Sequence, residues 1–227
     1  MVEEPRQPGA SHRSPGFLGM AITTYSELKT AVANWINRTD LTSRIPEFIA
    51  LAETRINRRL RIRAMETVYN ADTASSTKLY ALPTGFAGMR SFKLNTDPLT
   101  DLDYMTPENM DRIWAGSSTG KPKAYTLEGD NLRLSPTPDG AYEMELLYYK
   151  KFDALSDAAP TNWLMLNAPD VLLYGACLEA APYMKGHPDI PVWGEFFKSA
   201  MDDIETEDEQ DRHSGGAMAV RPDSPVY

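Results

Sequence analysis

The chain has 227 residues, enough for one domain of ordinary size or two small ones with their own cores. Hydrophobic residues make up 42% and charged residues 24% of the sequence, which excludes collagen-like, disulfide-rich and disordered classes. Acidic residues outnumber basic ones by 32 to 23, and the resulting net charge of -9 argues against a protein that grips nucleic acid tightly.

The sequence gives no sign of secretion or of a membrane anchor. The one cysteine, Cys177, cannot form an internal disulfide. No apolar run approaches the roughly 20 residues that span a bilayer, and the proline-rich N-terminus lacks a signal-peptide core. We therefore expect a protein of a reducing cytosol with no membrane partner.

Two helices are predicted after an N-terminal extension. Residues 1–19 are rich in Pro, Gly and Ser and are not expected in the core. The stretch from Thr24 to Glu27 fits a capping box and predicts a first helix over about 24–37. Pro46 suits the first turn of a second helix, which an apolar stripe extends to about residue 62. The stripe consists of Ile45, Phe48, Ile49, Ala52, Ile56 and Leu60.

The other faces of this second helix and its continuation carry a concentrated positive charge, which we call the arginine patch. The arginine patch consists of Arg55, Arg58, Arg59, Arg61 and Arg63. It stands out in an otherwise acidic chain.

Between about residues 65 and 152 the hydrophobic period changes to two, which predicts a β domain. A hairpin is expected where apolar residues alternate on both sides of Glu128-Gly129-Asp130-Asn131. A further strand should turn Tyr142, Met144, Leu146 and Tyr148 inward. Other strands are predicted near 65–73, 77–82 and 89–95, and a short helix from Thr106 to about Trp114.

Two more helices are predicted toward the C-terminus. The segment from Pro169 to Ala181 is apolar nearly all round, which indicates a central buried helix ended by Pro182. The last helix begins near Pro188 to Pro191. Its predicted apolar side consists of Trp193, Phe196, Phe197, Ala200, Met201 and Ile204.

The last helix then becomes strongly acidic, and we call this stretch the acidic run. The acidic run consists of Asp202, Asp203, Glu205, Glu207, Asp208, Glu209 and Asp211. A flexible tail with Arg212 and Arg221 is expected to follow.

The order of these elements predicts an α+β fold, in which N- and C-terminal helices form one helical bundle and an antiparallel β domain is inserted between them. The expected divisions are an N-terminal extension at 1–19, a bundle from 20–64 and 163–211, a β domain at 65–162 and a tail at 212–227.

Few residues suit catalysis. His12 and His213 lie in the predicted tails, and His187 lies in a Gly-His-Pro turn, so none has the rigid support of a general base. Cys177 lies within the most apolar helix, where desolvation raises the pKa of a thiol. No glycine pattern predicts a phosphate-binding loop. We expect no catalytic residue, metal or cofactor, although a pair of carboxylates acting in a hydrolase stays open as an alternative.

The arginine patch and the acidic run are the best clues to function. They are either solvated helix faces, partners within one chain, or an interface between subunits. Because the guanidinium fork favours bidentate contacts with carboxylates, the last interpretation predicts an oligomer. The candidate subunit interface contains both groups together with Arg212 and Arg221.

Six stretches of the sequence form a further pattern. They are residues 25–28, 44–53, 56–58, 162–164, 168–170 and 174–183, which read YSEL, RIPEFIALAE, INR, NWL, APD and YGACLEAAPY. Together they resemble the head-to-tail adaptor proteins of tailed bacteriophages, including the tail tubular protein A group, and the likeness covers roughly 20–212. The resemblance also makes the candidate subunit interface a candidate portal interface.

The resemblance implies a structural role rather than an enzymatic one. In this family a helical bundle carries an inserted β domain, and a twelve-subunit ring lies under the portal protein, joining the capsid to a tail or nozzle protein. Duplex DNA then passes through the channel without sequence-specific binding. The resemblance also implies synthesis in the bacterial host cytoplasm, a place at the head-tail junction of the virion, and C-terminal segments that contact portal or neighbouring subunits.

Two other interpretations stay open, namely a virion stopper or tail-completion protein and a soluble carboxylate-dependent hydrolase. For the ring we expect acidic or neutral residues along the bore, with Arg55 to Arg63 turned mainly toward protein, because a basic wall would bind DNA and hinder its passage.

Overall fold

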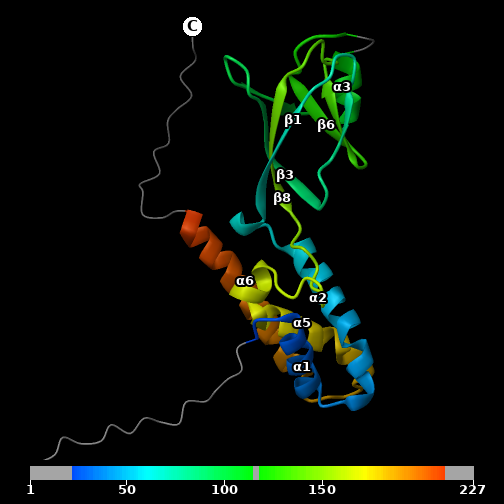
Figure 1. Cartoon of the computed structure of the whole chain (residues 1–227), viewed down its shortest axis with the longest axis vertical. Helices are drawn as coiled ribbons and strands as arrows, with labels where there is room; N and C mark the ends of the chain where they lie inside the picture. Colours follow the sequence, from blue (N-terminus) through cyan, green and yellow to red (C-terminus); the bar gives the residue numbers. More distant parts are fainter. Residues whose placement is uncertain (1–21, 115–117, 213–227) are drawn as a thin grey trace, which may run out of the picture.

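The computed structural model describes residues 22–114 and 118–212. Two parts lie one after the other along the long axis of the molecule (Figure 1). Helices from both ends of the described chain form one part, and strands from its middle form the other. The predicted α+β fold with a β insert between terminal helices is therefore confirmed.

The helical part begins with α1. Its bounds and those of the other helices in this part are α1 Tyr25–Ile36, η1 Thr39–Arg44, α2 Ile45–Arg59, η2 Arg63–Met65, α4 Trp163–Asn167, α5 Pro169–Ala180, η3 Ala181–Tyr183 and α6 Ile190–Arg212, where η denotes a 3-10 helix. The capping box is confirmed, because the Glu27 amide donates to Thr24 Oγ1 at 3.3 Å and the Thr24 amide donates to Glu27 Oε2 at 3.0 Å.

α2 ends at Arg59, three residues before the end expected from its apolar stripe. The backbone becomes extended at Leu60. Leu60 and Ile62 are both buried, and Arg61 between them is exposed. The spacing from Ile56 to Leu60 fits a helix, whereas Leu60 and Ile62 alternate as an extended chain does. The prediction of a helix to residue 62 is therefore wrong in its last turn.

α5 is the central helix, as predicted, and it packs against α1, α2, α4 and α6. Gly175 lets the neighbouring helices approach closely, because a Cβ atom there would lie 3.0 Å from Ala52 Cβ and 3.1 Å from Phe197 Cε2. On α6 the predicted apolar side is buried except for Phe196, which is 45% exposed and lies against Tyr174 at 5.3 Å between ring centroids.

The β part consists of two four-stranded sheets. Their orders are β1-β8-β3-β4 and β2-β7-β6-β5. The bounds are β1 Glu66–Asp72, β2 Leu79–Ala81, β3 Phe86–Leu94, β4 Thr100–Asp101, β5 Asp103–Tyr104, β6 Ala124–Glu128, β7 Asn131–Ser135 and β8 Glu143–Lys150. The strand pairs are antiparallel, as predicted, except β5 with β6, which are parallel.

The predicted hairpin is confirmed as β6 and β7, which meet at a Gly129-Asp130 turn. Met144, Leu146 and Tyr148 on β8 are buried as expected, whereas Tyr142, predicted on the same strand, precedes β8 and is half-buried. The short helix is α3 Pro107–Ile113, at whose start Thr106 occupies the capping position without a side-chain hydrogen bond.

The two parts have separate clusters of buried side chains, one among the helices and one between the sheets. The chain passes between the parts twice, after α2 and after β8. On this basis we propose the domain limits that the sequence predicts. The extension 1–19 and residues 213–227 of the predicted tail lie outside the described residues, whereas Arg212, predicted as the first residue of the tail, is the last residue of α6.

Candidate functional site at the waist

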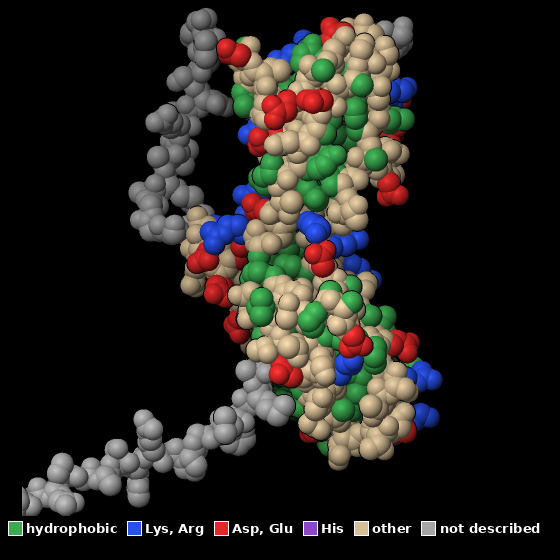
Figure 2. Space-filling model, in the orientation of Figure 1, with side chains coloured by type: hydrophobic (Ala, Val, Ile, Leu, Met, Phe, Trp, Pro, Cys, Tyr) green, Lys and Arg blue, Asp and Glu red, His purple; other side chains and the backbone are tan. Residues whose placement is uncertain are grey.

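The arginine patch and the acidic run come together where the two parts join, a region that we call the waist. The waist consists of residues 59–66, the last three turns of α6 and the strand ends that face them. Figure 2 shows basic and acidic side chains interspersed at this level, between surfaces with more apolar side chains above and below.

Two arginines, one at the end of α2 and one at the start of η2, form ion pairs with α6. Arg59 Nη2 lies 2.8 Å from Asp202 Oδ1, and its Nε lies 3.8 Å from Glu205 Oε1. Nearer the C-terminal end of α6, Arg63 Nη2 lies 2.8 Å from Asp211 Oδ2, and the Arg63 backbone amide donates to Asp208 Oδ1 at 2.7 Å. Both groups of charge are thus partly paired within one chain.

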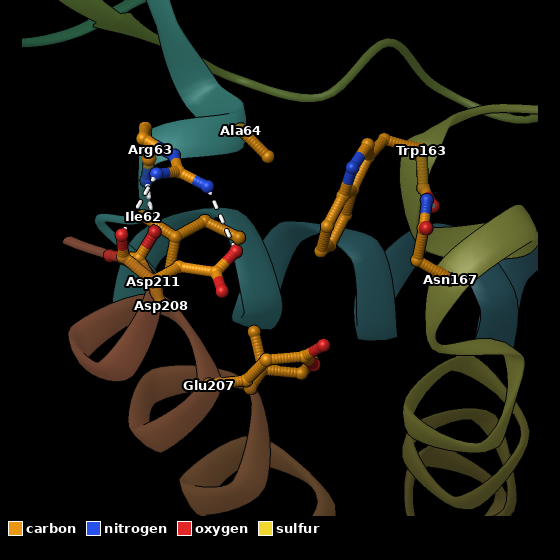
Figure 3. Close-up of a pocket in the computed structure, with 9 residues that line it drawn as sticks. Ile62, Arg63, Ala64, Trp163, Asn167, Glu207, Asp208 and Asp211 are labelled. Carbon is orange, nitrogen blue, oxygen red and sulfur yellow. Dashed lines mark hydrogen bonds and ion pairs between the residues drawn. The ribbon is translucent and has the colours of Figure 1, made fainter. Parts of the chain in front are cut away.

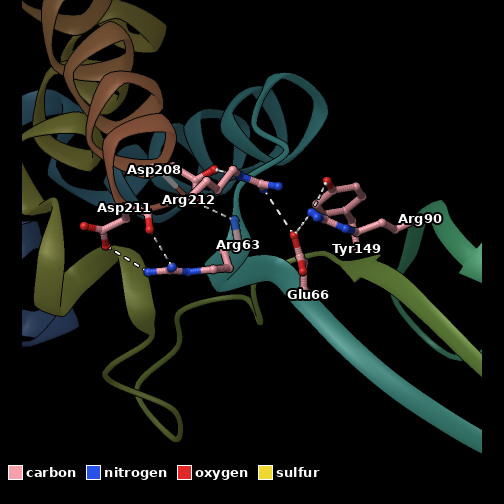
Figure 4. Close-up of polar contacts among 7 residues, drawn as sticks. All are labelled: Arg63, Glu66, Arg90, Tyr149, Asp208, Asp211 and Arg212. Atoms are coloured by element: carbon pink, nitrogen blue, oxygen red, sulfur yellow. Dashed lines mark hydrogen bonds and ion pairs between the residues drawn. The ribbon is translucent and has the colours of Figure 1, made fainter. Parts of the chain in front are cut away.

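A second set of contacts joins the end of α6 to the sheet (Figure 4). Arg212 Nε donates to Asp208 Oδ2 at 2.7 Å, and Arg212 Nη2 lies 3.1 Å from Glu66 Oε1 at the start of β1. Arg90 of β3 also donates to Glu66, and it reaches the Tyr149 hydroxyl at 3.3 Å. The hydrogen bond to Asp208 raises the pKa of the Arg212 guanidinium. Glu66 therefore receives one arginine from each part of the molecule.

The remaining members of the arginine patch have different surroundings. Arg55 pairs with Glu179 of α5 at 2.5 Å. Arg61 donates to backbone carbonyls, among them that of Ala87 in β3 at 3.2 Å. Arg58 is exposed, makes a 3.4 Å contact with the Thr54 carbonyl, and has no ion pair among the described residues.

Three acids of the acidic run are also exposed and have no ion pair within residues 22–114 and 118–212. They are Asp203, Glu207 and Glu209. Arg221, the last residue of the candidate interface, lies outside the described residues.

A hollow of about 390 Å³ opens beside these contacts, between α6, η2 and α4 (Figure 3). Trp163 and Ala64 lie on one side of it, and Glu207, Asp208 and Asp211 lie on the α6 side. Asp208 and Asp211 are engaged with Arg63, so their carboxylates are held by the fold. The hollow is thus a charged surface depression at the waist.

One buried carboxyl group, near the place where the chain returns from β8 to the helices, was not predicted from the sequence. Glu53 is only 5% exposed, and its Oε1 accepts from the Leu155 amide at 2.9 Å and from Asn162 Nδ2 at 3.4 Å. Burial raises the pKa of Glu53 to about 6, and these hydrogen bonds oppose the shift.

One turn further along α2, Asn57 continues this support. Its Oδ1 accepts from the Phe152 amide at 2.8 Å, and its Nδ2 donates to the Phe152 carbonyl at 3.4 Å. Glu53 and Asn57 together hold the chain that returns from β8 to the helices. The place of Glu53 between Ala52 and Ile56 on the apolar face is the signal that could have revealed it.

The cysteine and the described histidine, weighed above as catalytic residues, are packed against other side chains. Burial raises the pKa of Cys177 to about 12, as predicted from its helix. His187 stacks on Trp193 with ring centroids 5.1 Å apart. Within the described ranges, no three His, Cys, Asp or Glu side chains are grouped so as to hold a metal ion. No helix in the part of the chain that the structure describes is long and apolar enough to cross a bilayer.

A comparison with protein families identifies the kind of protein. A family model described as SU10 adaptor protein matches residues 23–222, which includes nearly all of the described chain. The match defines a head-tail adaptor of tailed phages, the class that the sequence resembles. The chain belongs to the SU10 adaptor protein family. None of the curated proteins matches it.

Proposed function

We propose that this protein is the structural head-to-tail adaptor of a phage particle. Copies of the chain form a twelve-subunit ring below the portal protein, contact a tail or nozzle protein on the other side, and surround part of the DNA channel at the head-tail junction. The observation that carries the proposal is the family match over residues 23–222.

The waist supports this proposal because it offers two different charged surfaces on one copy. A closed ring is built from heterologous contacts, in which one patch of a subunit meets another patch of its neighbour. Arg58 supplies an exposed cation, and Asp203, Glu207 and Glu209 supply exposed carboxylates. We therefore propose that Arg58 of one copy meets the acidic run of the next, while Arg59 and Arg63 stabilise the single chain.

The charge of the chain suits a conduit. Duplex DNA carries one negative charge per about 1.7 Å of its axis, and cationic walls bind it by releasing counterions. A net charge of -9 per copy, repeated around a ring, favours a wall that repels DNA and lets it slide. We propose that acidic or neutral side chains line the bore.

Mass photometry of the purified chain, alone and with portal protein, tests ring formation. We expect assembly with portal into a particle whose added mass corresponds to a ring. Arg58→Glu should weaken assembly, because each subunit contact exchanges an attraction of up to about 1 kcal/mol for a repulsion, and the change is repeated at every contact. Its thermal stability should stay close to that of the native chain.

Lys78→Glu provides the matched control, because it makes the same change of charge at an exposed position of the β part. Assembly of the Arg58 variant at the native level would contradict the interface proposal. A chain that stays monomeric with portal would contradict the adaptor function itself. Cryo-EM of the head-tail junction then distinguishes an adaptor from a stopper by its position, and an arginine-lined bore would contradict the proposed channel wall.

A further inference from the structure

The outer strand β1 has a long open edge. It pairs with β8 along all seven of its residues, from Glu66 to Asp72, and it is the first strand of its sheet. The other edge strands within the described ranges are shorter, with three residues in β2 and two each in β4 and β5. The free backbone groups of β1 therefore form the longest unpaired edge among these four.

Three features that often protect such an edge, namely lysine, proline and a bulge, are missing from β1. Its sequence contains no lysine and no proline, and its pairing with β8 runs without a bulge. Val68 is 54% exposed and Tyr69 is 42% exposed. An open edge with exposed apolar side chains is a template for an added strand.

The described chain ends beside this edge. Arg212, the last described residue, places Nη2 3.1 Å from the Oε1 atom of Glu66, the first residue of β1 (Figure 4). The chain that continues after Arg212 thus leaves from the waist end of β1. The family match includes residues 213–222 of this continuation, but none of the first 22 residues of the chain.

The sequence of the continuation fits a short strand. Residues 213–216 read HSGG, and two glycines permit the change of direction that must follow a helix. Residues 217–221 read AMAVR, in which Met218 and Val220 alternate, and Pro222 then ends the capacity to donate to a ladder. Five extended residues span about 17 Å and seven span about 23 Å, so the segment fits within the edge of β1.

Charge selects the direction and register. Arg221 is the sole lysine or arginine between residues 213 and 227. Asp72, at the far end of β1, is exposed and has no ion pair among the residues that the structure describes. If the segment runs parallel to β1 with Ala217 level with Val68, two residues beyond Glu66, then Arg221 lies level with Asp72.

We propose that residues 217–221 add to the open edge of β1 in the same chain, as a parallel fifth strand of this sheet, with Arg221 paired to Asp72. The added strand covers Val68 and Tyr69 and anchors the segment that follows α6.

Amide hydrogen exchange of the full chain, resolved by NMR, tests the proposal. The β1 amides that do not bond to β8 should be protected in the native chain. Val220→Pro removes a backbone donor from the segment, so these amides should exchange at least about tenfold faster in this variant. The matched control Ser224→Pro changes a position beyond the segment and should leave them protected. Equal exchange in all three chains overturns the proposal.

Two further measurements test the register and the origin of the strand. Asp72→Arg should speed exchange of the same amides, and the double variant with Arg221→Asp should restore their protection; a double variant that exchanges as fast as the single one overturns the register. Isotope-labelled Val220→Pro chain is then mixed with unlabelled native chain. Renewed protection of the labelled chain would mean that the strand comes from another copy and would overturn the same-chain proposal, whereas unchanged exchange supports it. Unaltered protection of β7 and β8 verifies that each variant is folded.

Discussion

Replacing Glu53 by glutamine should change how the stability of this protein depends on pH. The carboxyl group is 5% exposed, and burial raises its pKa to about 6 from the ordinary value of 4.5. Its Oε1 accepts from the Leu155 amide and from the Asn162 side chain. A glutamine amide oxygen can accept the same hydrogen bonds without a charge.

The sign follows from proton binding. Between pH 4.5 and 6 the folded chain keeps a proton on Glu53 that the unfolded chain has released, so stability falls as the pH rises through this window. Below pH 4.5 the proton is bound in both states and the contribution is complete. A shift of about 1.5 units at about 1.4 kcal/mol per unit gives a loss of about 2 kcal/mol by pH 7.5. Glu53→Gln lacks this loss.

Urea unfolding, followed by tryptophan fluorescence at pH 4.5, 5.5, 6.5 and 7.5, measures the effect. The free energy of unfolding of Glu53→Gln minus that of the native chain should rise by about 2 kcal/mol across this range. Other titrating groups are common to both chains and cancel in the difference.

Glu27→Gln is the control with the opposite sign, because hydrogen bonds from Thr23 and Thr24 lower the pKa of Glu27. The stability that its charge contributes is present above the ordinary pKa and is lost as the pH falls through the lowered value. A Glu53→Gln difference that does not vary with pH would refute the argument from burial.

Two further predictions concern the packing of α5. Gly175→Ala should lower the free energy of unfolding by about 1–3 kcal/mol, because the added Cβ would press on Ala52 and Phe197. Gly194→Ala on α6 is the control, because an added Cβ there meets no atom within 4 Å, and it should raise the free energy of unfolding by about 0.5–1 kcal/mol. Urea titrations that rank the two variants the other way would contradict this prediction. Cys177, whose pKa burial raises to about 12, should react with an aromatic disulfide reagent only after unfolding, and rapid labelling of the native chain at pH 8 would show that the thiol is accessible.

Most elements were predictable because their signals are local. The capping box at Thr24, the stripe from Ile45 to Ile56 and the turn at Gly129 each depend on residues a few positions apart. The end of α2 was not predictable from the sequence. The step from Ile56 to Leu60 satisfies the helical period, although Leu60 already belongs to an extended chain. A periodic pattern alone cannot distinguish a helical from an extended backbone at this residue, because tertiary contacts decide between them.

The contacts of the waist were beyond prediction for a different reason. The sequence showed two opposite charge clusters, but not that Arg63 reaches Asp211 or that Glu66 receives both Arg90 and Arg212. These partners are separated by 24 to 148 residues, and their distances depend on how the helical and β parts are set against each other. Pairing within one chain is one of the alternatives that the two charge clusters allow, and the structure shows it for Arg59 and Arg63.

The ion pairs of Arg59 and Arg63 within the chain indicate which charged side chains remain for a contact with another subunit. Exposed ion pairs contribute only about 0–1 kcal/mol each, so the contacts of Arg59 and Arg63 serve mainly to orient α6 against the waist. Pairing within the chain also makes these two guanidinium groups less available to DNA phosphates. Arg58 and the unpaired acids then carry the charge that another surface would meet, which is why the Arg58 variant, rather than a variant of Arg59 or Arg63, separates assembly from folding.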